Sequence, residues 1–124
     1  MGFRKRAGGG HKYQAVATTV HGFRFASKAE ARRYQDLLLI GMAGEIRNLE
    51  LQPRFDLHVS GEKVATYVAD FRYEERNTLV PAFLRAGWRD VVEDVKGVKT
   101  PVYRMKRKHL AAEYGIAVKE VCAR

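Results

Sequence analysis

The sequence predicts one small domain of the α/β (α+β) class, in which a mixed β-sheet is flanked by helices. Three observations predict this class: two helical segments with capping signals, several runs in which apolar and polar residues alternate, and an order that intersperses strands with helices. At 124 residues, the chain is long enough to bury one hydrophobic core and short for two domains of ordinary size.

The N-terminal region is predicted to consist of a tail and a hairpin. Residues 1–12 mix glycine with basic residues and contain almost nothing that could be buried, which is typical of a flexible basic tail. Residues 13–25 then alternate in a way that favours two short strands, with a turn at His21 and Gly22. We therefore expect the folded domain to comprise residues 13–124.

The first helix is predicted from Ser27 to about Ala43. Ser27 and Glu30 have the spacing of a capping box, and Gly44 is a typical helix terminator. One face of this helix combines apolar residues with a single carboxylate. Its members are Glu30, Tyr34, Leu37, Leu38 and Gly41. The carboxylate of Glu30 is thus expected on the inward side.

Two strands and a long loop are predicted next. Residues 51–59 alternate clearly, residues 60–63 form a turn, and residues 64–73 continue as a second strand, so we expect a hairpin. The pattern fails over residues 74–87, where asparagine, proline and glycine interrupt it. This segment predicts a loop with a short helical turn around residues 82–86.

The C-terminal third is predicted to hold the central strand, a second helix and a last strand. Residues 88–96 include three valines and should lie in the middle of the sheet. Thr100 and Pro101 supply an N-cap and a first-turn proline for a helix that runs to about Tyr114. Residues 117–121 make a short final strand. The sequence contains no internal repeat.

The composition favours a polyanionic partner. Lysine and arginine number 23 against 14 acidic residues, which gives a formal net charge of +9. No apolar run approaches membrane-spanning length, and the first ten residues lack the apolar core of a signal peptide, so nucleic acid is a better candidate than a membrane. The single cysteine, Cys122, excludes a disulfide framework and fits a cytoplasmic protein. The four histidines show no paired metal-ligand spacing.

Charged residues inside two of the predicted strands indicate a site. Alternation places Asp94 and Lys96 on one side of the central strand and Glu93 on the other. Asp70 occupies a similar position in the preceding strand. Two carboxylates and a lysine that converge on one face could hold magnesium or manganese and activate a water, which is what hydrolysis of a phosphodiester requires.

Four stretches of the chain carry a resemblance. They are 25–34, 44–53, 67–71 and 92–97. The sequences of these segments resemble a family of small bacteriophage and prophage proteins of unknown function. The resemblance extends over about residues 13–121. A helix glutamate, a strand aspartate, an acid-x-lysine strand and a following basic helix also resemble the PD-(D/E)xK nuclease superfamily. The layout is similar to that of phage endonuclease-I type junction resolvases and of the nuclease subunit of certain transposases.

The resemblance implies a restriction-endonuclease-like core and a magnesium-dependent or manganese-dependent nuclease domain in residues 13–124. It assigns catalytic positions to Glu30, Asp70, Asp94 and Lys96. The metal ligands would be Asp70, Asp94, the backbone carbonyl of Val95, and Glu30 for a second metal or a metal-bound water. Lys96 would orient or activate the attacking water.

Two further residues could support this site. Gln52 is polar and begins a predicted core strand, so it needs a partner. Glu93 stands beside Asp94, where the superfamily more often has glutamate at the ligand position. A register shift of one residue would exchange the two carboxylates, although the spacing to Lys96 favours Asp94.

Each assignment has a structural alternative. Glu30 could serve only the capping box. Asp70 could simply end a strand, and Asp94 and Lys96 could form a surface ion pair on an edge strand. Glu93 could be solvated or paired with an arginine. For each side chain, the role in the site and the structural alternative predict different degrees of burial.

A basic surface is expected beside the site, because the second predicted helix carries four cations within five positions. The residues expected to contact DNA are Arg32, Arg33, Arg104, Lys106, Arg107 and Lys108. The alternative for this helix is an ordinary solvated face.

We therefore expect a metal-dependent endodeoxyribonuclease that acts on branched DNA, such as a Holliday junction, in phage recombination or replication. The alternatives are a sequence-recognising or nonspecific nicking nuclease, or an inactive DNA-binding protein on the same scaffold. A homodimer is expected, because paired incision needs two sites and the loop 74–87 is more apolar than solvation requires.

Overall fold

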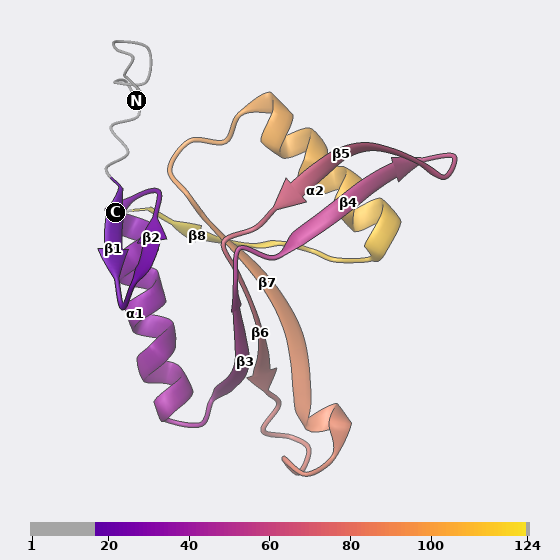
Figure 1. Cartoon of the computed structure of the whole chain (residues 1–124). Helices are drawn as coiled ribbons and strands as arrows, with labels where there is room; N and C mark the ends of the chain where they lie inside the picture. Colours follow the sequence, from indigo (N-terminus) through magenta and orange to yellow (C-terminus); the bar gives the residue numbers. More distant parts are fainter. Residues whose placement is uncertain (1–16, 124) are drawn as a thin grey trace.

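The computed structural model describes residues 17–123, so the predicted tail and the first residues of the predicted hairpin lie outside the described range. Two helices, α1 (Lys28–Met42) and α2 (Pro101–Tyr114), flank a mixed sheet, as Figure 1 shows. The predicted α+β class is therefore confirmed.

The strands form one four-stranded sheet and two separate two-stranded ribbons. They are β1 (Thr18–Val20), β2 (Phe23–Phe25), β3 (Ile46–Leu51), β4 (Arg54–Val59), β5 (Glu62–Val68), β6 (Phe71–Arg76), β7 (Trp88–Lys96) and β8 (Lys119–Cys122). The main sheet has the order β3-β6-β7-β8, and β1-β2 and β4-β5 are the ribbons. Because β7 and β8 are parallel and the other pairs are antiparallel, the main sheet is mixed. β7 lies inside it, as predicted.

Both helices begin and end where their capping residues predict. The Ser27 side chain accepts from the backbone N–H of Glu30 at 3.2 Å, and the Thr100 side chain accepts from that of Tyr103 at 3.1 Å. Pro101 occupies the first turn of α2, and Gly115 follows the helix in the left-handed conformation, with φ of 70°. These local signals fix the helix boundaries without help from tertiary packing.

The two faces of the main sheet carry two separate cores. α1 packs through Ala31, Tyr34 and Leu37 against Phe71 and Tyr73 of β6. On the other face, α2 and the β4-β5 ribbon pack around a second apolar cluster. Its buried members are Phe55, Leu57, Tyr67, Ala69, Val92, Tyr103 and Leu110. This packing shows which side of the sheet each residue of β7 faces. Val92 and the other even-numbered residues face α2, and the odd-numbered residues face α1.

The predicted strand 51–59 is wrong in one respect, because it is two strands. Leu51 ends β3 in the main sheet, and Arg54 begins β4 in the ribbon. Gln52 has a positive φ of 52°, and Pro53 has no N–H to donate to a ladder, so the chain turns from one sheet to the other here. Strand β3 was not predicted because Asn48, at φ of 56°, interrupts the alternation with an irregular register.

The predicted strand 64–73 also divides into two, at Ala69 and Asp70. β5 belongs to the ribbon and β6 to the main sheet. Backbone hydrogen bonds connect the two residues at this break to other segments. Ala69 N–H donates to the carbonyl of Pro53 at 3.1 Å, and Asp70 N–H donates to the carbonyl of Glu93 at 3.1 Å. Asp70 therefore lies at the crossing of the two sheets and not within a strand.

The loop between β6 and β7 is shorter than predicted, since β6 continues to Arg76 and the loop spans only residues 77–87. The guanidinium of Arg76 donates to the carbonyls of Val80 at 2.9 Å and Gly87 at 3.1 Å. A Cβ at Gly87 would clash with the backbone of Pro81. The predicted helical turn is a 3-10 turn, η2, at Arg85–Gly87. This loop is thus closed by defined contacts.

Candidate metal site at the sheet crossing

The candidate site forms where Asp70 meets the C-terminal end of β7. One carboxylate oxygen of Asp70, Oδ2, accepts from the backbone N–H of Val95 at 2.7 Å. The carbonyl of Asp70 accepts from Gln52 N–H at 2.9 Å. Asp70 thus lies between the end of one strand and the start of the next, close to what its structural alternative predicted. This position brings its carboxylate against β7.

Asp94 is buried on the α2 face, with 1% of its surface exposed. Its Oδ2 accepts a short hydrogen bond from the hydroxyl of Tyr67. Its Oδ1 is buried and has no hydrogen-bond partner in the part of the chain that the structure describes, and the ammonium of Lys96 lies 4.0 Å from it. A buried carboxylate oxygen without a donor is costly and needs an explanation. The alternative of a surface ion pair on an edge strand is excluded, because β7 is interior and Asp94 is buried.

The two aspartates behave as a pair of neighbouring acids. Burial raises the pKa of the Asp70 carboxyl to about 7, and the nearby charge of Glu30 adds to this rise. Burial likewise raises the pKa of Asp94 to about 7, the charge of Asp70 adds to the rise, and the hydrogen bond from Tyr67 opposes it. A buried and a half-buried carboxylate that resist ionisation together form an arrangement that a bound cation would stabilise.

The carbonyl of Val95 points toward Asp70. Backbone groups alternate along a strand: Glu93 C=O accepts from Asp70 N–H, whereas Lys96 C=O accepts from Ala123 N–H on the β8 side. Val95 follows Glu93 by two residues, so its carbonyl faces the Asp70 side. Asp70, Asp94 and this carbonyl supply oxygen ligands of the kind that magnesium prefers, and magnesium commonly keeps waters for its remaining positions.

Glu30 and Lys96 flank these ligands. Glu30 is half-buried at the start of α1, on the inward side that the sequence predicts. No three His, Cys, Asp or Glu side chains within residues 17–123 are grouped to hold a single metal ion. Glu30 interacts with Asp70 from the start of α1 and is thus a neighbour of the two-aspartate site. The ammonium of Lys96 also lies 4.3 Å from the ring centroid of Tyr103.

Glu93 is fully buried on the opposite face. Its Oε2 accepts from Nε of Arg33 at 2.6 Å, and its Oε1 accepts from Arg33 at 3.0 Å and from the Tyr73 hydroxyl at 2.7 Å. Of the two alternatives for Glu93, pairing with an arginine is confirmed and solvation is wrong. Gln52 is exposed, and the contact it makes near the site is through its backbone N–H.

Three buried tyrosines bind carboxylates at the candidate site and around it. Tyr67 contacts Asp94, Tyr73 contacts Glu93, and the hydroxyl of Tyr103 donates to Glu120 at 2.7 Å. The usable signal was chemical: a buried tyrosine, unlike phenylalanine, needs a partner for its hydroxyl. Spacing alone could not identify which carboxylate each hydroxyl would reach.

The expected DNA-contacting residues fall into two groups. Arg32, Arg104 and Lys108 are exposed. The other three make internal contacts: Arg33 binds Glu93, Lys106 donates to the carbonyl of Thr66 at 3.0 Å, and Arg107 lies 3.6 Å from Glu120. We retain only the exposed group as candidates for a phosphate-binding surface.

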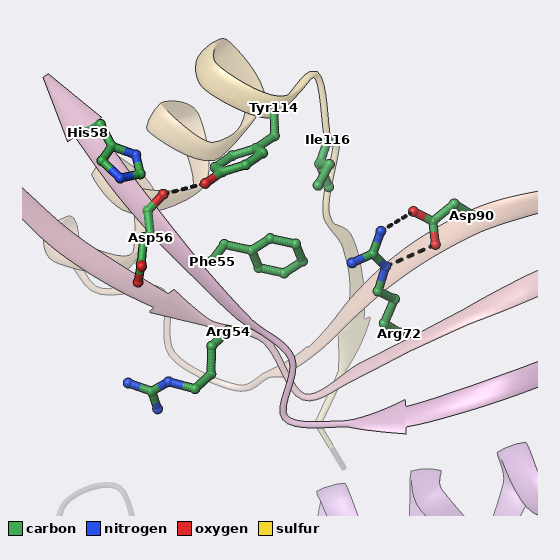
Figure 2. A pocket seen from close by; sticks show the side chains of 8 residues that line it. All are labelled: Arg54, Phe55, Asp56, His58, Arg72, Asp90, Tyr114 and Ile116. Atoms are coloured by element: carbon green, nitrogen blue, oxygen red, sulfur yellow. Dashed lines mark hydrogen bonds and ion pairs between the residues drawn. The ribbon is translucent and has the colours of Figure 1, made fainter. Parts of the chain in front are cut away.

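A groove of about 750 Å³ lies on the α2 face, between β4, β7 and the end of α2. Figure 2 shows the ion pair of Arg72 with Asp90 on one side and the Tyr114 hydroxyl bound to the carbonyl of Asp56 on the other. Arg54 points away from both contacts. Asp90 precedes Asp94 by four residues on the same face of β7, so this groove borders the candidate site without containing it.

Comparison with known proteins places the chain in a family. A family model described as "Protein of unknown function (DUF1064)" matches residues 10–122. The chain belongs to this family. The match includes every residue of the candidate site. No curated protein and no solved structure matches the chain. No helix within residues 17–123 has the length and apolar character needed to cross a membrane. The function of this DUF1064 protein is therefore argued from its site.

Proposed function

We propose that this protein is a metal-dependent endodeoxyribonuclease. The observation that carries the proposal is the buried Oδ1 of Asp94, which has no hydrogen-bond partner among residues 17–123 and belongs to a carboxylate next to the half-buried carboxylate of Asp70. The sequence resemblance to the PD-(D/E)xK superfamily, with its restriction-endonuclease-like core, supports the same conclusion. The working location would be the cytoplasm.

The residues present fit a magnesium or manganese ion. Asp70, Asp94 and the carbonyl of Val95 would hold it, and the bound ion would neutralise phosphate oxygens and lower the pKa of a water. Lys96, beside Asp94 Oδ1, would orient that water and balance charge on the scissile phosphate. Tyr67 holds the second oxygen of Asp94 in place. Glu30 would contact a water of the site.

The test is cleavage of supercoiled plasmid and of synthetic four-way junctions over a titration of Mg²⁺ or Mn²⁺, with EDTA and Ca²⁺ as controls. We expect incision that requires Mg²⁺ or Mn²⁺. Junction cleavage faster than duplex cleavage would support action on branched DNA. A banding pattern fixed by sequence would favour a sequence-recognising enzyme. Absence of cleavage with retained DNA binding would leave the inactive DNA-binding alternative.

The DNA-binding surface is proposed to be the exposed side of α2. The net charge of +9 supports a polyanionic partner. Reversing the charge of Arg104 and Lys108 together should weaken binding to all sequences alike and flatten the slope of log affinity against log salt by about one unit per lost contact. Fluorescence anisotropy at several salt concentrations measures this slope.

The matched control reverses two cations on the α1 face, Arg89 and Lys119, which line a different groove. Their double reversal changes the net charge equally and should leave the slope near that of the unsubstituted protein. An equal effect of both double variants would show that net charge, and not the surface of α2, governs binding.

A homodimer is proposed through the loop 77–87. Leu79 is 92% exposed and Phe83 is 87% exposed, although the loop that presents them is closed by contacts from Arg76. Light scattering at micromolar concentration should report about twice 14.1 kDa. Leu79→Asp with Phe83→Asp should reduce this to the monomer mass.

The control for the dimer is Leu39→Asp, because Leu39 is 65% exposed and belongs to α1 and not to the loop. This variant should keep the mass of the unsubstituted protein. A monomer that nicks linear duplex as readily as junctions would contradict both the dimer and the preference for branched DNA.

A further inference from the structure

The ion pair between Arg33 and Glu93 joins the two elements that carry opposite sides of the candidate site. Arg33 lies on α1 and Glu93 on β7. The carboxylate of Glu93 is 0% exposed and receives both guanidinium hydrogen bonds, at 2.6 and 3.0 Å. The hydrogen bond to Glu93 raises the pKa of the Arg33 guanidinium. Two parallel hydrogen bonds fix both the distance and the rotation of the helix relative to the strand.

The pair also stands directly beside site residues on both elements. Glu30 precedes Arg33 by one turn of α1, about 4.5 Å along the helix axis. Asp94 follows Glu93 on β7. Any shift of α1 along the sheet would therefore move Glu30 relative to Asp70, with which it interacts.

Tyr73 completes the contact from β6. Its hydroxyl donates to Oε1 of Glu93 at 2.7 Å, and it is 2% exposed. α1 also makes apolar contacts with the sheet, through Tyr34 and Leu37. Apolar packing is non-directional, so it holds the helix on the sheet without defining its position as sharply.

A stabilising role alone does not account for this arrangement. Replacing a buried ion pair by apolar residues of similar volume is often neutral or stabilising, because two buried charges lose much of their hydration. The directional property of the pair is what an apolar replacement would lack.

We propose that Arg33, Glu93 and Tyr73 form a positioning clamp that sets Glu30 against the two-aspartate site and thereby tunes its affinity for the divalent metal. This inference rests on the proposed function. None of the three residues touches the metal or the substrate, so they are positioning residues and not catalytic ones.

The test compares Arg33→Met/Glu93→Met with the unsubstituted protein in three measurements: thermal unfolding, binding of Mn²⁺ by calorimetry, and the Mg²⁺ concentration that gives half-maximal plasmid cleavage. We expect only a modest drop in unfolding temperature, because no unpaired charge is left behind and only the buried Tyr73 hydroxyl loses its acceptor. Mn²⁺ affinity and cleavage should fall by about 10-fold to 100-fold, the range for partners that orient metal ligands.

The control is Arg72→Met/Asp90→Leu, which removes an ion pair with contacts at 3.2 and 2.8 Å between β6 and β7 that does not involve α1. It should leave Mn²⁺ affinity unchanged. Tyr73→Phe supplies a second, milder test, because it removes one hydrogen bond to Glu93 and keeps the ion pair. It should fold normally and reduce Mn²⁺ affinity by a smaller factor.

The outcomes separate the two proposals. The clamp would be overturned if the folded double variant kept its Mn²⁺ affinity and metal dependence, and the proposed nuclease function would be unaffected. If the double variant does not fold, the same result in Tyr73→Phe would overturn the clamp. Failure of the unsubstituted protein to bind Mn²⁺ or to cleave DNA would overturn the proposed function, and the clamp with it.

Discussion

Replacing Asp94 or Asp70 by asparagine is expected to abolish DNA cleavage. Each substitution keeps the shape of the side chain and removes a negative charge that would hold the metal. Electrostatic contacts at a reacting centre are each worth about 100-fold to 1000-fold in rate, and loss of a metal ligand should cost at least the upper value. Single-turnover cleavage at saturating Mg²⁺ measures the effect, and anisotropy should show DNA binding largely intact.

Stability should move in the opposite direction from activity. At pH 8 and without metal, the asparagine variants should unfold at the same temperature as the unsubstituted protein or a higher one, because each removes a buried charge whose ionisation is unfavourable. Asp90→Asn is the matched control, since Asp90 is an exposed acid on the same face of β7. It should keep cleavage activity.

Calorimetry supplies the decisive comparison for this assignment. Undiminished Mn²⁺ binding by both Asp70→Asn and Asp94→Asn would remove these residues as ligands. Glu93 is no longer an alternative ligand of the same metal, because its carboxylate lies on the other face of β7 and is bound by Arg33. Glu93→Gln should lower the melting temperature, since it leaves the Arg33 charge without its partner.

Without metal, the protein is expected to lose stability as the pH rises from about 4 to 7. Asp70 and Asp94 have ordinary pKa values near 3.8 when unfolded and values of about 7 when folded. Between these values the folded state binds more protons than the unfolded state, so the free energy of unfolding falls with increasing pH. The loss continues through pH 7 and is complete only once both carboxylates are ionised in the folded protein.

Divalent metal should reverse this trend, because it binds the ionised pair. At pH 8, Mn²⁺ at one hundred times its dissociation constant should raise the free energy of unfolding by about 2.7 kcal/mol. At pH 5 the same concentration should have little effect, since protons compete for the carboxylates. Thermal unfolding across this pH range, with and without Mn²⁺, measures both quantities.

The control for the pH experiment is the double variant Asp70→Asn/Asp94→Asn. Its stability should depend much less on pH between 4 and 7, and Mn²⁺ should not stabilise it at pH 8. A pH profile identical to that of the unsubstituted protein would show that other groups cause the dependence.

Local patterns predicted the elements that local interactions define. Ser27 and Thr100 begin their helices because their side chains bind backbone N–H groups three residues away, and the alternation around Val92 marks a strand with two buried faces. The prediction that Asp94 and Lys96 share a face follows from the same two-residue period. The hairpin formed by β4 and β5 was predicted for similar reasons, from its alternation and its Ser60 and Gly61 turn.

Tertiary structure decided the features that depend on residues distant in sequence. The alternation continues from Leu51 to Phe55 and through Tyr67, Ala69 and Phe71, so the sequence could not reveal that the chain leaves one sheet for another at each point. That exchange places Asp70 at the crossing, where its carboxylate reaches the N–H of Val95. The burial of Asp94 Oδ1 without a partner, and the contacts of Glu93 with Arg33 and Tyr73, likewise arise from packing among separate elements. A sequence period specifies which side of a strand a residue occupies, whereas the partner it meets there is set by the folding of the whole chain.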